Sequence, residues 1–355
     1  MSSYNIYGGT PKKTLDLMNY FKENSSIYIY EGSFSEYKNR FEESGGNVYE
    51  GVYGWNLYKH LKTLLKIINK NNITIVQTQF NMGEVLGTLI KLFRPKIKLI
   101  VAFVSPFSPC SYKKVLASFN YRFVDAFVFV SQYVKQNKLE QFSLIGKKKN
   151  VVIYNGTNKR AASNIDTIVI NKYALLDIAG LSKWKNTRVL VEALNIIINK
   201  RNRTNIHLYI AGDGPERKNL EKLIKAYSLQ KKVFLLGYQE NVGKLLNDCD
   251  IFVHPAYAEA FGIVVPEAML AQKPIIVSNA GALPELIEHE KTGLIVEPHN
   301  PRDWADAIIQ LTENPEFSSQ LAKNAEKSAT ERFSYNKFCG EYEKLYNILL
   351  NNNFQ

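Results

Sequence analysis

The sequence predicts an α/β protein built from two domains, each a doubly wound parallel sheet with helices on both faces. Short β-rich runs alternate with helix-length amphipathic segments, and this alternation is typical of parallel sheets with crossover helices. A chain of 355 residues is longer than most single domains, and a hydrophobic content of 45% is enough for two packed cores. The predicted strands fall into two successive sets, which also favours two domains.

The first half alternates in this way from its first helix onward. Runs rich in β-branched and aromatic residues predict strands over residues 26–30, 73–78, 97–103, 126–130 and 151–154, with helices over 56–69 and 83–93. Gly8 and Gly9 form a loop that runs directly into a helix. A doubly wound domain normally has a buried strand before such a loop, and no Val/Ile run precedes this one. The first strand is therefore expected to be missing, or the start site to be misplaced.

The second half repeats the pattern and ends differently. Strands are predicted over residues 206–210, 233–236, 251–253, 274–277 and 293–296, with helices over 187–201 and 216–230. A lysine run, a strand and then Asn155-Gly156 indicate a linker. A helical pattern over residues 316–350 has no strand after it. The predicted division is a first domain over residues 1–158, a second over 159–334 and a C-terminal helix over 335–355.

The cysteines and the apolar runs bear on where the protein works. Cys110, Cys249 and Cys339 are odd in number and widely spaced, which fits neither a disulfide framework nor a zinc site. No signal peptide opens the chain, and apolar windows such as residues 99–107 are too short to span a bilayer. These features predict a cytoplasmic protein.

The charge is distributed unevenly along the chain. Residues 1–160 contain 23 Lys and Arg against 10 Asp and Glu, whereas residues 161–355 contain 22 against 23. The whole basic excess therefore lies in the first part and favours an anionic partner there, such as a phospholipid surface, a phosphorylated lipid carrier or nucleic acid. A lysine-rich surface that only keeps the protein soluble is an equally good interpretation.

Residues 258–270, AEAFGIVVPEAML, are apolar apart from Glu259 and Glu267. The stretch follows a predicted strand, with Glu259 in the loop and Pro266 close to the start of the next helix, where a missing N–H costs little. Free amides near Gly262 would attract phosphate. Two acids on either side of such amides suit a ligand with hydroxyls at both ends and phosphate in the middle, such as a nucleotide sugar. Taken alone, the two glutamates are better interpreted as ordinary solvated residues of the loop and the helix.

The wider stretch EAFGIVVPEAMLAQKPIIVSNAGALPELIEHEKTGLIV resembles the signature of retaining glycosyltransferases of the GT-B fold, in family 4 of the sequence-based classification. LSKWKN, YIAGDGPERKNLEKL and VFLLGYQE fall upstream in the family's order, and VSQYVKQ lies in the first domain. The resemblance is dense in the second half and thin in the first. It implies two Rossmann-like domains facing a cleft, with C-terminal helices that cross back to the first domain.

The resemblance also assigns roles to individual residues. Glu259 is similar to the acid that holds the donor sugar hydroxyls, Glu267 to the acid that binds the ribose hydroxyls, and Lys185 to the lysine that neutralises the diphosphate. Glu259 and Lys185 are the implied catalytic pair. The other implied donor-binding residues are the backbone and side-chain positions Phe261, Gly262, Ile263, Gly237, Tyr238, Gly8 and Gly9.

Several positions differ from the family or imitate other sites. The family usually has an arginine five residues before the lysine, where this chain has Gly180, and Lys183 is out of register. Asp248 and Asp250 imitate a metal-binding aspartate pair, but they are interpreted as a helix-to-strand turn. No metal and no cofactor beyond the nucleotide-sugar co-substrate are predicted. His254 lies next to the implied site and is interpreted as a packed histidine.

The resulting hypothesis is a hexosyltransferase that retains the anomeric configuration. Its expected partners are a nucleotide-sugar donor and a lipid-linked or growing surface-polysaccharide acceptor, such as lipopolysaccharide or capsule. The basic first domain is expected to contact the anionic inner face of the cytoplasmic membrane. No nucleic-acid partner is expected. Two alternatives stay open: a non-catalytic GT-B subunit that scaffolds a partner, and a nucleotide-sugar epimerase or phosphorylase of the same architecture.

Overall fold

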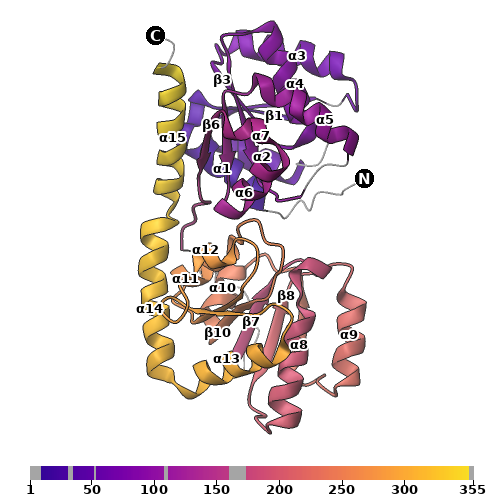
Figure 1. Ribbon diagram of the computed structural model, residues 1–355, viewed down its shortest axis with the longest axis vertical. Coiled ribbons are helices and arrows are strands. Elements are labelled where there is room, and N and C mark those ends of the chain that lie inside the picture. Colours follow the sequence, from indigo (N-terminus) through magenta and orange to yellow (C-terminus); the bar gives the residue numbers. More distant parts are fainter. Residues whose placement is uncertain (1–8, 31–34, 52, 108–110, 160–172, 352–355) are drawn as a thin grey trace. The chain divides into compact units, whose positions relative to one another are not determined.

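The computed structural model describes residues 9–30, 35–51, 53–107, 111–159 and 173–351 (Figure 1). The chain divides into two compact units. Unit 1 comprises residues 1–156 and 335–355, and unit 2 comprises residues 157–334. The expectation of a missing first strand concerns residues 1–8 and lies outside the described residues.

Unit 1 contains two described sheets, and every strand pair in them is parallel. The smaller sheet pairs β1 with β2, and the larger has the order β3-β4-β5-β6. The strands are β1 (Ser26–Tyr30), β2 (Asn47–Gly51), β3 (Ile75–Thr78), β4 (Lys98–Phe103), β5 (Ala126–Phe129) and β6 (Lys149–Val152). The α-helices are α1 (Gly9–Phe21), α2 (Ser35–Glu43), α3 (Leu57–Lys70), α4 (Phe80–Phe93), α5 (Ser111–Asn120), α6 (Gln132–Gln141), α7 (Ser143–Gly146) and α15 (Tyr335–Asn351).

The last helix, α15, belongs to unit 1 although the chain reaches it from unit 2. Its residues Phe338, Tyr342 and Leu345 pack in one buried cluster with Ile100 of β4 and Val128 of β5. Side chains spaced three or four residues apart lie on one face of a helix, so α15 covers one face of the four-stranded sheet with an apolar stripe.

Unit 2 is built around one parallel sheet with the strand order β12-β11-β10-β7-β8-β9. Its strands are β7 (Ala174–Ile178), β8 (His207–Ala211), β9 (Val233–Gly237), β10 (Ile251–His254), β11 (Ile275–Ser278) and β12 (Leu294–Val296). Its α-helices are α8 (Arg188–Asn195), α9 (Arg217–Ala226), α10 (Val242–Asp248), α11 (Val264–Leu270), α12 (Leu283–Leu286), α13 (Pro301–Glu313) and α14 (Pro315–Arg332). The core includes the fully buried Trp304, whose Nε1 donates to the Glu297 carbonyl at 3.1 Å.

The prediction of an α/β chain with parallel sheets is confirmed, and most predicted elements lie within three residues of their observed bounds. Two strands, β2 and β7, were not expected. The predicted helix over residues 187–201 ends as an α-helix at Asn195 and continues as a π-helical turn, Ile196–Lys200. The helical pattern predicted over residues 316–350, interpreted as a pair of helices, is observed as α14 and α15. The chain turns between them at Phe333-Ser334, where the Thr157 N–H donates to the Phe333 carbonyl at 2.8 Å.

Candidate donor-binding site of unit 2

The candidate site lies where the strand order of unit 2 reverses. Starting from β7, the chain adds β8 and β9 on one side of the sheet and then β10, β11 and β12 on the other. The carboxyl ends of β7 and β10 are therefore neighbours whose following loops diverge. Ligands of open α/β sheets bind in the crevice at such a switch point. The implied catalytic pair lies in the loops after these two strands: Lys185 follows β7 and Glu259 follows β10.

Lys185 is placed by a short helical turn between β7 and α8. Residues Lys183–Lys185 form a 3-10 turn, and Asn186 ends it with a left-handed backbone at φ 55°. The Asn186 side chain donates to the carbonyls of Pro255 at 3.3 Å and Pro298 at 2.6 Å, which ties this turn to the loops after β10 and β12. Asparagine tolerates this left-handed conformation better than most residues, so Asn186 both turns the chain and anchors it.

Lys185 and Glu259 meet directly. The Lys185 Nζ donates to Oε2 of Glu259, and the two side chains are 23% and 14% exposed. Burial by itself would raise the pKa of the Glu259 carboxyl. The Lys185 ammonium and then His254 outweigh that effect and hold the pKa of Glu259 well below its usual range. Glu259 is therefore an ionised carboxylate at every physiological pH.

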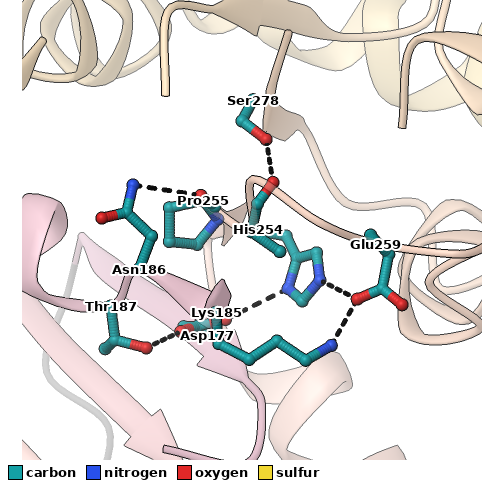
Figure 2. Close-up of polar contacts among 9 residues, drawn as sticks. Asp177, Lys185, Asn186, Thr187, His254, Pro255, Glu259 and Ser278 are labelled. Carbon is teal, nitrogen blue, oxygen red and sulfur yellow. Dashed lines mark hydrogen bonds and ion pairs between the residues drawn. The ribbon is translucent and has the colours of Figure 1, made fainter. Parts of the chain in front are cut away.

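His254 is part of the same cluster, as Figure 2 shows. Its Nε2 lies 3.3 Å from Oε2 of Glu259, and its Nδ1 lies 3.3 Å from Oδ1 of Asp177. Both His254 and Asp177 are fully buried. Thr187 donates from Oγ1 to Oδ2 of Asp177 at 3.1 Å. The cluster thus runs from Thr187 through Asp177, His254 and Glu259 to Lys185.

The interpretation of His254 as an ordinary packed histidine was incomplete, and Asp177 was not considered. His254 is packed, but both of its ring nitrogens face carboxylates. Burial lowers the pKa of His254, whereas the hydrogen bonds to Asp177 and Glu259 raise it, and the net pKa lies above the ordinary value. The signal in the sequence was ALLDI, a β7 segment with one acid inside an apolar run, because a buried carboxylate in a central strand needs a partner.

Glu267 is set apart from this cluster. It lies in the first turn of α11, is 2% exposed, and accepts a hydrogen bond on Oε1 from Thr157 Oγ1 at 3.4 Å. Gly262 and Ile263 come directly before α11, and Gly262 has a left-handed backbone at φ 81°. A Cβ atom at Gly262 would lie 3.1 Å from Cγ of Glu259, so a side chain there would crowd that acid.

The remaining predicted residues occupy different surroundings. Gly237 ends β9 with φ 70°, and its carbonyl accepts from the Gly212 N–H at 2.7 Å. Tyr238 beside it is 53% exposed. Phe261 is 2% exposed and packs edge-on against Phe333, with ring centroids 5.8 Å apart, so its side chain serves the core of unit 2. A role for these residues in donor binding stays a prediction.

The first-domain glycines lie in unit 1. Gly8 lies outside the described residues, and Gly9 is the first residue of α1. In unit 2, Gly180 follows β7, and the out-of-register Lys183 points to solvent. Gly180 has no side chain and Lys183 is exposed, so neither residue replaces the family arginine beside the Lys185–Glu259 pair.

Of the two aspartates that imitate a metal site, Asp250 has a structural role. Asp250 lies between α10 and β10 and accepts on Oδ2 from the Ala174 N–H at 2.8 Å, which caps the start of β7. Across the described part of the chain, no group of three His, Cys, Asp or Glu side chains could hold a metal ion. The expectation of a metal-independent site stays a prediction.

Comparisons with known proteins agree with the fold. Residues 158–328 match the family described as Glycosyl transferases group 1. The N-acetyl-alpha-D-glucosaminyl L-malate synthase of Bacillus anthracis is 29% identical over 216 residues, which are 58% of this chain and 56% of that protein. The chain spans about half the length of the first curated relatives that it matches.

Two further comparisons cover more of the chain. The N,N'-diacetylbacillosaminyl-diphospho-undecaprenol alpha-1,3-N-acetylgalactosaminyltransferase of Campylobacter jejuni is 25% identical over 318 residues, 83% of this chain and 82% of that protein. The crystal structure of Anabaena Alr3699/HepE in complex with UDP superposes with a TM-score of 0.83 at 20% identity, over 96% of both chains. The chain therefore has the GT-B fold, and its residues 158–328 match the group 1 glycosyl transferase family.

Proposed function

We propose that this protein is a retaining glycosyltransferase that moves a hexose-type sugar from a nucleoside-diphosphate sugar to a lipid-linked or growing polysaccharide acceptor. The observation that carries the proposal is the Lys185–Glu259 ion pair at the strand-order reversal of a group 1 domain. The site offers one cation for phosphate and one ionised carboxylate for hydroxyl groups, which are the two chemistries that a donor of this class presents.

The pair has a direct role in the chemistry of transfer. The bond from the anomeric carbon to the diphosphate oxygen breaks, and the electron pair stays on the diphosphate. Lys185 stabilises this developing negative charge, which is the largest single contribution that such sites make. Glu259 accepts hydrogen bonds from sugar hydroxyls and stabilises the positive charge on the ring. The acceptor oxygen then bonds to the anomeric carbon from the same face, and its proton passes to the leaving diphosphate.

The nucleoside half of the donor is assigned to the second acid. Glu267 is buried at the start of α11 and held by Thr157, so its carboxylate has a defined position from which to accept the two ribose hydroxyls. Gly262 and Ile263 lie between the two acids in the chain, directly before α11, and their backbone amides are assigned to the sugar and the diphosphate. Gly237 and Tyr238 are assigned to the base.

The acceptor is assigned to unit 1 because of its charge and its exposed aromatic side chains. Trp55 and Tyr58, at the start of α3, are 80% and 73% exposed. Lys59, Lys62 and Lys66 follow at helical spacing and are also exposed. Tryptophan and tyrosine favour the membrane interface, and lysines are attracted to anionic headgroups. A lipid-linked acceptor, such as the diphospho-undecaprenol in the name of the Campylobacter relative, would be met at such a surface.

No helix among the described residues is long and apolar enough to cross a membrane. We propose a peripheral membrane contact through the start of α3, which is expected to weaken as salt screens the lysine charges. The corresponding site of action is the inner face of the cytoplasmic membrane.

A thermal-shift panel of UDP-, GDP- and ADP-sugars tests the proposal. A donor at 100 times its Kd stabilises the folded protein by about 2.7 kcal/mol, which raises Tm measurably. A shift with one nucleotide sugar, followed by slow hydrolysis of that sugar, supports a transferase. Conversion of the sugar to an epimer, or phosphorolysis of a glycan, would instead favour the epimerase or phosphorylase alternative.

The scaffold alternative rests on two expectations from the sequence, the replacement of the family arginine by Gly180 and the missing first strand, and the second concerns residues outside the described range. A non-catalytic subunit has no need to keep a buried Lys185–Glu259 pair, because an ion pair that is not used gives little stability. The absence of a shift with every nucleotide and nucleotide sugar would support the scaffold and overturn the transferase.

A further inference from the structure

His254 is held between two carboxylates by both of its ring nitrogens. Nδ1 faces Asp177 and Nε2 faces Glu259, each at 3.3 Å. A carboxylate only accepts hydrogen bonds, and a neutral imidazole has only one N–H to donate. Only the imidazolium cation satisfies both contacts. The geometry therefore points to a second buried cation in the site, in addition to Lys185.

Asp177 is itself fixed in place. It lies on β7, whose Leu176 pairs with Phe252 of β10, so Asp177 and His254 lie on neighbouring strands near their carboxyl ends. Thr187 donates to the carboxylate oxygen of Asp177 that does not face His254. Because the strands and Thr187 together restrict Asp177, the imidazolium is held in one orientation toward Glu259.

The charges of the cluster balance. Asp177 and Glu259 carry two negative charges, and His254 and Lys185 carry two positive charges. An uncompensated charge inside a protein is costly, so each buried acid needs a cation beside it. Lys185 Nζ and His254 Nε2 both contact Oε2 of Glu259. No described residue donates a hydrogen bond to Oε1, which is the oxygen available to a ligand hydroxyl (Figure 2).

We propose that His254, held by Asp177, is a positioning residue that keeps Glu259 ionised and oriented when Lys185 turns from Glu259 to the donor diphosphate. This inference rests on the proposed donor site. A diphosphate competes with Glu259 for the Lys185 ammonium, whose flexible stem allows it to move. His254 is fully buried and cannot follow, so it remains as the counter-ion of Glu259 while the carboxylate accepts from the sugar.

The proposal predicts a dependence on pH. The charged groups that face His254 are Asp177 on β7, Glu259 on the loop after β10 and Lys185 in the turn before α8. The acids raise the pKa of His254 above its ordinary value. The imidazolium that the two carboxylate contacts require is lost as the pH rises through this raised pKa. Binding of the sugar half of the donor should weaken on the alkaline side.

The protonation state can be tested in the wild-type protein. With ¹⁵N-labelled histidine, the His254 signal is identified as the one that disappears in His254→Gln, with the exposed His299→Gln as the matched control. At pH 7.5, about one unit above the ordinary histidine pKa, we expect both ring nitrogens of His254 to carry protons. A spectrum with a single protonated nitrogen at that pH would overturn the proposal, and this measurement does not require any variant to be active.

The role in binding is tested with free UDP and GDP beside UDP-glucose, UDP-N-acetylglucosamine and GDP-mannose. For whichever sugar binds the wild type, His254→Gln should weaken affinity by about 10- to 100-fold, the loss typical of one charged hydrogen bond. Affinity for the free nucleoside diphosphate should change less than about twofold. Asp177→Asn should move the alkaline loss of sugar-nucleotide affinity to lower pH, and Thr187→Val should move it in the same direction by a smaller amount.

The outcomes separate this inference from the proposed function. If the wild type binds none of the five probes and no ADP-sugar, the donor site itself is wrong. If the wild type binds a donor but His254→Gln lowers the affinities for the nucleoside diphosphate and for the nucleotide sugar equally, His254 is merely structural and the inference fails. The inference also fails if Asp177→Asn leaves the pH dependence unchanged, while the proposed donor site stands.

Discussion

A Cβ atom on Gly281 would lie 2.6 Å from the carbonyl oxygen and 2.7 Å from the backbone nitrogen of Glu259. Gly281 also has a left-handed backbone at φ 60°, and the next residue, Ala282, donates its N–H to the Glu259 carbonyl at 2.9 Å. The loop after β11 thus supports the backbone of the candidate catalytic acid and requires glycine at its closest approach.

Gly281→Ala is expected to destabilise unit 2 by about 2 kcal/mol or more, because the new methyl group meets backbone that cannot rotate away and the φ angle disfavours alanine. Urea unfolding measures the loss, and donor affinity should fall with it. Gly340→Ala is the matched control, since a Cβ atom at that position of α15 meets nothing within 4 Å. It should stabilise the helix by about 0.5–1 kcal/mol. Equal effects of the two variants would contradict the close approach.

Lys185→Ala should lower the rate of transfer or of donor hydrolysis by about 100- to 1,000-fold, because the leaving diphosphate loses its cation. Steady-state kinetics with the donor found in the thermal-shift panel measures this. Lys183→Ala removes an exposed lysine two residues away and should change the rate less than about threefold. A Lys185 variant as active as the wild type would show that the leaving group is stabilised elsewhere.

Glu259→Gln and Glu267→Gln should separate the two halves of the donor. The Glu267 variant should lower the affinity for free UDP or GDP and for the corresponding nucleotide sugar by a similar factor, about tenfold, because both ligands carry the ribose. The Glu259 variant should lower the affinity for the nucleotide sugar only. Isothermal titration calorimetry measures both affinities. The assignment of the two acids would be reversed if the pattern were exchanged.

Acid titration should reveal the charge of Glu259. Its pKa is lowered in the folded protein from an ordinary value of 4.5, so its ionised form favours folding above that pH, and the contribution is lost as the pH falls toward the folded pKa. The difference in unfolding free energy between wild type and Glu259→Gln should therefore shrink as the pH falls from 5 to 3. This range lies below the pH at which His254 loses its proton. A difference that grows toward acid would contradict the sign of the shift.

Replacement of Trp55 and Tyr58 by serine should reduce binding of the protein to vesicles with anionic headgroups by about tenfold at low salt, since both side chains are exposed and adjoin the lysines of α3. Vesicle co-sedimentation measures this, with neutral vesicles in parallel. Ile348→Ser, on the exposed side of α15, is a control for the loss of any exposed apolar side chain. Equal binding of the wild type to both kinds of vesicle would remove the membrane from the proposal.

The local pattern of the sequence was sufficient for most of the fold. Alternating β-rich and amphipathic runs located ten of the strands, because these periodicities arise from each segment burying its own apolar face. It missed β2, NVYEG, in which polar and glycine residues interrupt the apolar pattern, and β7, ALLDI, which contains an acid. Propensity is a poor guide where pairing with neighbouring strands stabilises the segment.

The candidate site also has a part that the sequence indicated and a part that only the structure showed. The stretch from Glu259 to Glu267 could be proposed as a site from the sequence, because a loop, a glycine and two acids lie within one strand–loop–helix unit and the wider stretch resembles a family signature. Gly281 could not, since its requirement for glycine comes from the backbone of a loop that lies 22 residues earlier in the chain.

By itself, the sequence determined the parallel α/β architecture, the uneven charge of the two halves and the identity of the two acids. Only the tertiary structure decided that Lys185 contacts Glu259, that α15 packs on the sheet of unit 1, and that His254 lies between two carboxylates. Asp177 and His254 are 77 residues apart in the chain. The charge of a histidine depends on its burial and on the acids beside it, and strand order, which no local pattern encodes, brings those acids to it.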